Sequence, residues 1–158
     1  MLNEYLTEMT RIAEKYGATI DKFVGDAIMV FFGAPWPTND RDHALRAVRM
    51  AMEMQARLGD LRHLWIDRGS EEAFEIRIGI NTGQASVGNF GCQGRMDYTA
   101  IGRQVNMAAR LEVNCEPSRI LISHATWSLV RDEVPCVPKG EISVKGFRDP
   151  VKVYEVAA

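Results

Sequence analysis

Hydrophobic residues along this chain alternate between helical and extended spacing, and this alternation constrains the possible folds more than any other feature. Over residues 2–16, apolar side chains recur at helical spacing, which predicts a helix that ends at Gly17. Two extended apolar runs follow, 19–24 and 27–32, and they are joined by Gly25–Asp26. Two such runs across a glycine-containing pair are typical of a β-hairpin.

The rest of the chain continues to mix the two spacings. A long helix follows, which Thr38, Asn39 or Asp40 can cap and which extends to Trp65. Its apolar side is predicted to include Met52. Further helices are predicted over 104–113 and 123–131, and strands over 75–80, 85–90, 96–100, 120–122, 134–138, 141–144 and 151–156. This order predicts an α+β fold, with a mainly antiparallel sheet and helices packed on it.

Composition limits the class of protein. A chain of 158 residues, 46% hydrophobic and 25% charged, fits one soluble globular domain. Its formal net charge of −2 argues against nucleic acid as a partner, because nucleic-acid binders usually carry a basic excess. No apolar run approaches the ~20 residues that span a bilayer, so we expect no direct membrane contact. The cysteines are odd in number and far apart, which indicates reduced thiols and a cytoplasmic location: Cys92, Cys115 and Cys136.

The predicted hairpin carries two charged residues that could bind a ligand. Asp26 follows a glycine, which would let another group approach its carboxylate closely. Lys22 lies four residues earlier, on the first strand. Each also has a simpler interpretation, because aspartate commonly forms turns and a strand lysine is commonly solvated. The hairpin alone therefore does not decide between a structural and a functional role.

Asn106 and Arg110 stand four residues apart near the start of a predicted helix, so their side chains share one face. An amide and a guanidinium that point the same way can bind an oxyanion. An ordinary exposed helix face is the alternative. Lys145, which precedes a glycine near a strand end, could reach a phosphate or could be a surface lysine at a turn.

Four segments together resemble the class III nucleotidyl cyclase family, and most closely its bacterial adenylyl cyclases. The segments are IDKFVGDAIMVFFG, IRIGINTGQASVGNFG, RMDYTAIGRQVNMAARLE and VKGF. They occur in the family's order and spacing, and the resemblance covers the whole of 1–158. It implies a single catalytic domain with a ferredoxin-like core and an extra hairpin. Two such domains would pack head to tail as a homodimer, with composite active sites in the groove between them.

The resemblance also implies roles for individual residues. Asp26 matches a metal-binding aspartate, and Asn106 and Arg110 match the residues that position the ribose and stabilise the transition state. Lys22 and Thr99 match the pair that reads the purine, whereas Lys145 and Arg95 match residues that contact the phosphates. The reaction implied is conversion of ATP to 3′,5′-cyclic AMP and pyrophosphate in intracellular signal transduction, with two Mg²⁺ or Mn²⁺ ions.

Adenine fits the implied purine pair better than guanine. A lysine can donate to adenine N1, and a threonine oxygen can accept from the N6 amine. Guanine presents the opposite groups, and an unpaired buried polar group costs about 1–3 kcal/mol. Guanylyl cyclases of the family carry an acid in place of the lysine, so Lys22 argues against GTP as substrate. Thr99 resembles the bicarbonate-responsive branch of the family, which makes activation by bicarbonate a hypothesis.

One departure from the family bears on activity. Family members carry an earlier strand with a first metal aspartate before the helix that opens this chain, and we expect both to be missing from 1–158. Asp26 would then be the single metal aspartate, and a divalent cation would lose much of its binding energy. We expect this form to be weakly active or inactive. The alternative function is a non-catalytic cyclase-homology module that binds nucleotide or dimerises without turnover.

Overall fold

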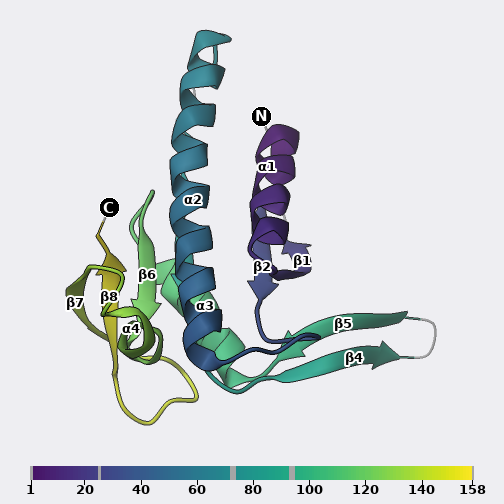
Figure 1. Cartoon of the computed structure of the whole chain (residues 1–158), viewed down its shortest axis with the longest axis vertical. Coiled ribbons are helices and arrows are strands. Elements are labelled where there is room, and N and C mark those ends of the chain that lie inside the picture. The colour runs from purple at the N-terminus through teal and green to yellow at the C-terminus, as the bar shows by residue number, and fades with distance from the viewer. Residues whose placement is uncertain (1, 25, 72–73, 93–94, 158) are drawn as a thin grey trace.

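The computed structural model describes residues 2–24, 26–71, 74–92 and 95–157, and for 92 and 95–97 it describes the backbone alone. Along the chain the elements are α1 (Leu2–Lys15), β1 (Thr19–Val24), β2 (Ala27–Phe31), α2 (Asp40–Asp67), β3 (Ile78–Ile80), β4 (Ser86–Cys92), β5 (Arg95–Ile101), α3 (Arg103–Asn114), β6 (Ile120–Ser123), α4 (His124–Val130), β7 (Cys136–Ile142) and β8 (Val151–Val156). Figure 1 shows their arrangement. The predicted α+β class is confirmed.

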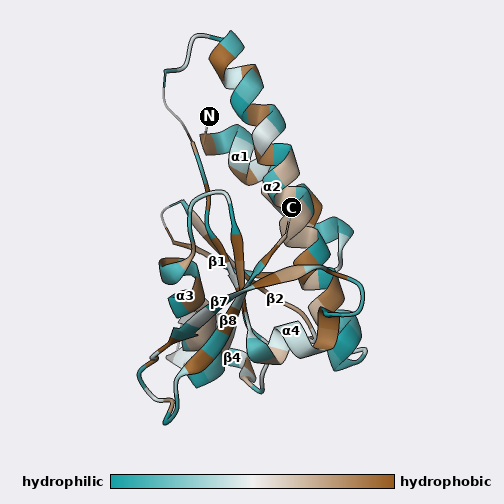
Figure 2. Ribbon diagram, turned by 90° about the vertical axis from the view of Figure 1, so that its left-hand side faces the viewer, coloured by the Kyte–Doolittle hydropathy of each residue, from teal (hydrophilic) through white to brown (hydrophobic). Residues whose placement is uncertain are grey.

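A four-stranded sheet with the order β3-β6-β8-β7 forms the centre of the fold. Only the β3–β6 pair is parallel, whereas β8 pairs antiparallel with both β6 and β7, so the predicted antiparallel bias is confirmed. All four residues of β6 are buried. Because successive strand residues point to opposite faces, complete burial means that helices cover both sides of this strand. Figure 2 shows hydrophobic residues along the strands where they cross the middle of the molecule.

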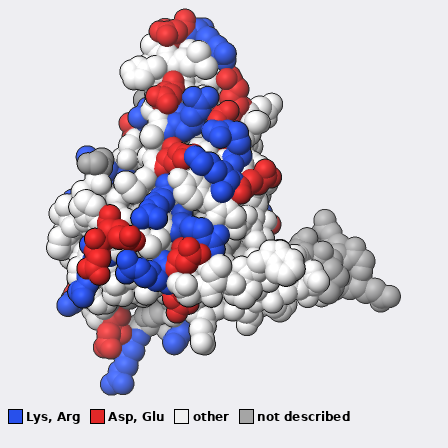
Figure 3. Space-filling view, in the orientation of Figure 1, with Lys and Arg blue, Asp and Glu red and all other residues white. Residues whose placement is uncertain are grey.

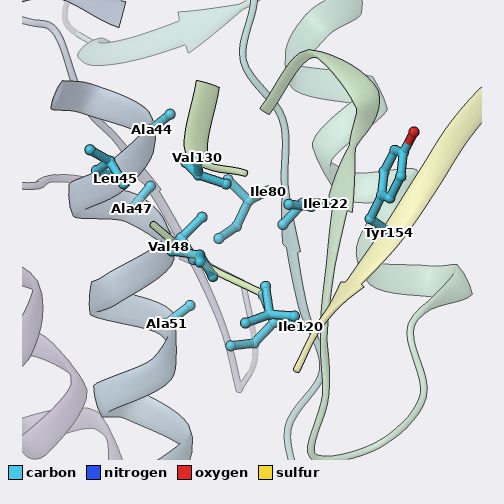
Figure 4. Close-up of a cluster of buried hydrophobic side chains, with 12 residues drawn as sticks. Ala44, Leu45, Ala47, Val48, Ala51, Ile80, Ile120, Ile122, Val130 and Tyr154 are labelled. Atoms are coloured by element: carbon cyan, nitrogen blue, oxygen red, sulfur yellow. The ribbon is translucent and has the colours of Figure 1, made fainter. Parts of the chain in front are cut away.

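The two faces of the sheet have separate hydrophobic cores. On one face, Ile120 and Ile122 of β6 pack with α2 and α4, in the cluster that Figure 4 shows. On the other face, Leu121 packs with Met107 and Leu111 of α3. The alternation along β6 therefore fixes which helices lie on which side, and it holds α3 firmly against the sheet.

The β1–β2 hairpin packs in a third core with α1 and α2, which lie side by side. Gly17 ends α1 with a φ of 76°, as its position predicted, and Asn39 caps α2 by accepting a hydrogen bond from Asp42 N at 2.8 Å. In the described part of the chain, β2 pairs with β1 alone and β3 is an edge strand. The expected absence of the family's first strand from 1–158 stays a prediction.

The antiparallel β4–β5 hairpin projects away from the rest of the molecule (Figure 1). Its strands extend to Cys92 and from Arg95, beyond the strand ends predicted at 90 and 96. The strand predicted over 75–80 begins only at Ile78, because Ile76 O accepts hydrogen bonds from Ser118 N and the Gln55 side chain instead of joining a ladder.

Two further predictions need correction. The separate strands predicted over 134–138 and 141–144 form one strand, β7, with an irregularity in register between Pro138 and Glu141. Met52, expected on the buried side of the long helix, is exposed, whereas Met50 and Met54 are buried. Within the described residues, no helix combines the length and the apolar character that a membrane span requires.

Candidate active site

An irregularity in the β1–β2 hairpin sets the direction of a buried aspartate. Ile20 pairs with Val30 and Lys22 pairs with Met29, so Asp21 is an extra residue with no partner on β2. A bulge of this kind re-aims side chains, and bulges are common beside active sites. The Asp21 side chain is only 1% exposed, although aspartate is uncommon inside strands. The bulge thus places a carboxylate inside the molecule next to Lys22.

Asp21 joins the two residues that were predicted to read the purine. Thr99 Oγ1, on β5, donates to Asp21 Oδ1 at 2.8 Å and to Oδ2 at 2.7 Å. Ala100 N also donates to Oδ2, at 2.9 Å. Lys22 Nζ lies 3.7 Å from Oδ1 in an ion pair. The structure therefore brings Lys22 and Thr99 together around one carboxylate, which the sequence analysis did not identify. A charged residue inside an apolar strand was the signal that could have pointed to it.

The predicted common face on α3 is confirmed. Asn106 and Arg110 are exposed, while Met107 and Leu111 are buried against the sheet. Hydrophobic packing of one helix face thus presents the amide and the guanidinium together on the other face. Among the described residues, no hydrogen bond or ion pair links this pair to the Asp21 group, so one chain presents two separate sets of polar side chains.

Contacts from β3 and the turn after it fix the start of α3. Asn81 Nδ2 donates to Gln104 O at 2.9 Å and to Gln104 Oε1 at 2.8 Å, and Ser123 Oγ donates to Asn81 Oδ1 at 2.7 Å. Gly79 packs so closely on α3 that an added Cβ would lie 2.6 Å from Ala108 O. These contacts determine where the exposed face of α3 sits relative to the sheet.

Lys145 lies in the connection between β7 and β8. Its side chain is exposed, and the neighbouring Val144 is buried in the core beneath α3. Phe147 in the same connection receives the Arg103 guanidinium over its ring, at 5.3 Å from the centroid. The packing of Val144 and Phe147 anchors this loop beside the start of α3. The Arg95 side chain, a predicted phosphate contact, lies outside the described part of the structure.

Asp26 is exposed in the turn between β1 and β2, and Gly25 before it lies outside the described residues. Burial, and secondarily the negative charge of Asp26, raises the pKa of Tyr5 to about 12. Asp26 supplies a hard oxygen ligand of the kind that Mg²⁺ prefers. Among the described residues, however, no three His, Cys, Asp or Glu side chains gather as a ligand set. Among the described residues, Asp26 therefore offers a single exposed carboxylate at this turn.

Comparison with known proteins places this arrangement in a family. Residues 1–158 match the family described as the adenylate and guanylate cyclase catalytic domain. The chain is 35% identical over 158 residues to adenylate cyclase 1 of Rhizobium meliloti (strain 1021), which covers 99% of this chain and 23% of that protein. The chain thus spans about a quarter of the length of this curated relative.

Solved structures give the same result. The adenylyl cyclase CyaB from P. aeruginosa is 53% identical with a TM-score of 0.96, over 99% of this chain and 80% of that chain. The guanylyl cyclase Cya2 is 38% identical with a TM-score of 0.89, over 99% of this chain and 78% of that chain. The predicted nucleotidyl cyclase fold is confirmed. The chain belongs to the family of adenylate and guanylate cyclase catalytic domains.

Proposed function

We propose that this chain is the catalytic domain of an adenylate cyclase, a phosphorus–oxygen lyase that converts ATP to 3′,5′-cyclic AMP and pyrophosphate in intracellular signalling. The observation that carries the proposal is the meeting of Lys22 and Thr99 around Asp21. An ammonium and a hydroxyl oxygen side by side offer a donor for adenine N1 and an acceptor for the N6 amine. The likeness to the CyaB structure supports the same substrate.

The exposed pair on α3 supports the reaction type. In the proposed reaction, the ribose 3′-oxygen forms a bond to the α-phosphorus, its proton leaves, and the bond to the β-phosphate oxygen breaks. Asn106 would orient the ribose, and the guanidinium of Arg110 would donate to the oxygens of the α-phosphate as negative charge builds on them. Lys145, exposed on its loop, would hold the terminal phosphates, and we assign Arg95 the same role.

A divalent ion, Mg²⁺ or Mn²⁺, is part of the proposal. Asp26 would hold it, together with oxygens of the triphosphate, because Mg²⁺ commonly binds through one or two carboxylates and substrate phosphates. Such an ion would supply neutralisation of the leaving pyrophosphate. The exposed position of Asp26 in a turn leaves its carboxylate accessible to a bound nucleotide.

We further propose that the active form is a homodimer. The proposal is supported by apolar side chains that one chain leaves exposed near the purine pair: Phe23, Val24, Phe90, Tyr98 and Ile101. Trp36, between β2 and α2, is 85% exposed. In Figure 3 the described atoms of the projecting β4–β5 hairpin are white, in contrast to the mixed charges over α2. A second copy that covers these residues would bring its own α3 face toward Lys22 and Thr99.

A second candidate function has one observation in its favour. Because the described residues gather no complete ligand set around Asp26, the domain could bind nucleotide or dimerise without turnover. Both candidates predict ATP binding, and only the first predicts cyclic AMP.

The deciding experiment incubates the purified chain with ATP and Mn²⁺ and measures cyclic AMP by mass spectrometry. Arg110→Ala is expected to lower the rate about 10²- to 10³-fold, by analogy with loss of one donor to a developing oxyanion. Arg119→Ala is the matched control, because Arg119 is exposed and pairs with Glu155 at 3.8 Å. Binding of ATP without any cyclic AMP, in this chain and in a form extended at its N-terminus, would favour the non-catalytic module.

A further inference from the structure

We propose that Asp21 is a positioning residue that makes Thr99 a hydrogen-bond acceptor toward the purine, and thereby sets the selectivity for adenine over guanine. The inference rests on the proposed function, in which Lys22 and Thr99 read the base. It assigns the selectivity to a third residue, which does not itself touch the nucleotide.

The direction of one hydrogen bond carries the argument. A hydroxyl group has a single proton and two lone pairs, and an ionised carboxylate can only accept. Thr99 Oγ1 lies 2.8 and 2.7 Å from the two Asp21 oxygens, so its proton is directed at the carboxylate. Thr99 is only 7% exposed, which limits competition from water. The hydroxyl therefore presents lone pairs, and no proton, to any group that approaches from outside.

The surroundings of Asp21 hold the carboxylate in place. Its position as the extra residue of the bulge turns its side chain toward β5, where Ala100 N donates to Oδ2 at 2.9 Å. Lys22 Nζ lies 3.7 Å from Oδ1. A carboxylate that accepts hydrogen bonds from a backbone N–H and a hydroxyl, and forms an ion pair with an ammonium, has little freedom to rotate. One side chain thus orients both residues of the purine pair.

The acceptor character of Thr99 discriminates between the two purines at position 6. The N6 amine of adenine can donate to the Thr99 oxygen, whereas O6 of guanine would place lone pairs against lone pairs. A site built to pair one polar group rejects an analogue that leaves buried groups unpaired. Without Asp21, the Thr99 hydroxyl could rotate and donate to O6. The acceptor character of Thr99 is therefore imposed by its neighbour.

The test replaces the carboxylate by an amide of similar size. In Asp21→Asn, the new NH₂ group can donate to Thr99 Oγ1, which frees the hydroxyl proton to turn outward. Dissociation constants are measured by calorimetry for 3′-deoxy-ATP and 3′-deoxy-GTP, because neither has the attacking hydroxyl and neither can be cyclised. We expect the preference for the adenine nucleotide to fall about tenfold in Asp21→Asn. Thr99→Ser, which keeps the hydroxyl, is expected to retain the preference, and so is Asp60→Asn, a surface control.

If Asp21→Asn weakened the binding of both nucleotides equally, the ratio of their dissociation constants would stay unchanged. That result would overturn the inference, because Asp21 would then only support the fold. Thr99→Val provides a second route if Asp21→Asn does not fold, as judged by circular dichroism. Loss of the hydroxyl should reduce the binding preference for the adenine nucleotide to a similar degree, and an unchanged preference would again refute the inference. Failure of the proposed function has a different signature: no cyclic AMP from ATP, with the adenine preference in binding intact.

Discussion

Substitution of Gly79 by alanine should disturb the candidate active site by displacing α3, the helix that carries Asn106 and Arg110. Gly79 lies on β3, directly beneath α3. A Cβ at this position would lie 2.6 Å from Ala108 O and 2.9 Å from Glu112 Cα, and it would also meet Glu112 N. All three atoms belong to the backbone of α3, so no flexible side chain can move aside. Relief requires the whole helix, with Asn106 and Arg110 on its outer face, to shift away from the sheet.

The size of the effect follows from these distances. Ala108 O must retreat by about 0.8 Å to reach ordinary van der Waals contact near 3.4 Å. Overpacking of a core typically costs about 1–3 kcal/mol, which lowers the urea midpoint by about 1 M if the m-value is about 2 kcal/mol/M. Misplacement of reacting groups by about 1 Å costs on the order of 10²-fold in rate. Gly79→Ala should therefore lose activity even at temperatures where it is fully folded.

Urea unfolding and cyclic AMP formation, both measured on Gly79→Ala, check the two parts of this prediction. Gly59→Ala is the matched control, because Gly59 lies inside α2 and an added Cβ meets nothing within 4 Å. That variant should gain about 0.5–1 kcal/mol from the better helix propensity of alanine, with unchanged activity. Wild-type stability and activity in Gly79→Ala would refute the close approach of β3 and α3.

Three further predictions concern stability. Asn39→Ala removes the cap that accepts from Asp42 N at 2.8 Å and should cost about 1 kcal/mol in urea unfolding. Leu111→Ala leaves a cavity in place of a side chain that is 0% exposed, and should cost about 3 kcal/mol of folding stability. That cost would lower the Tm by about 10 °C in calorimetry. A hydrogen bond from Arg57 holds the pKa of Glu8 below 4.5 in the folded state, so this contribution is present above pH 4.5 and is lost as pH falls through the folded value. The Tm from thermal melts should therefore fall more steeply between pH 5 and pH 3 in wild type than in Glu8→Gln. An equal fall of the Tm in both proteins would contradict that assignment.

Local pattern was sufficient to predict most of the elements. The helix Leu2–Lys15 and the hairpin strands followed from apolar spacing, because side-chain period depends only on backbone geometry. The shared face of Asn106 and Arg110 followed from the same rule. Boundaries failed where a tertiary contact replaced a ladder bond, as at Ile76, whose carbonyl is taken by Ser118 N and Gln55.

The chain by itself determined the candidate residues, and the tertiary structure decided which of them meet. Lys22 and Thr99 were predicted as a pair through family resemblance, yet Asp21, the residue that joins them, depends on a bulge in one hairpin and on the approach of another. Likewise, only packing shows that Gly79 sets the height of α3 above the sheet. Periodicity records which face of an element is buried. It does not predict which distant part of the backbone packs against that face, because this contact depends on how all three cores pack together.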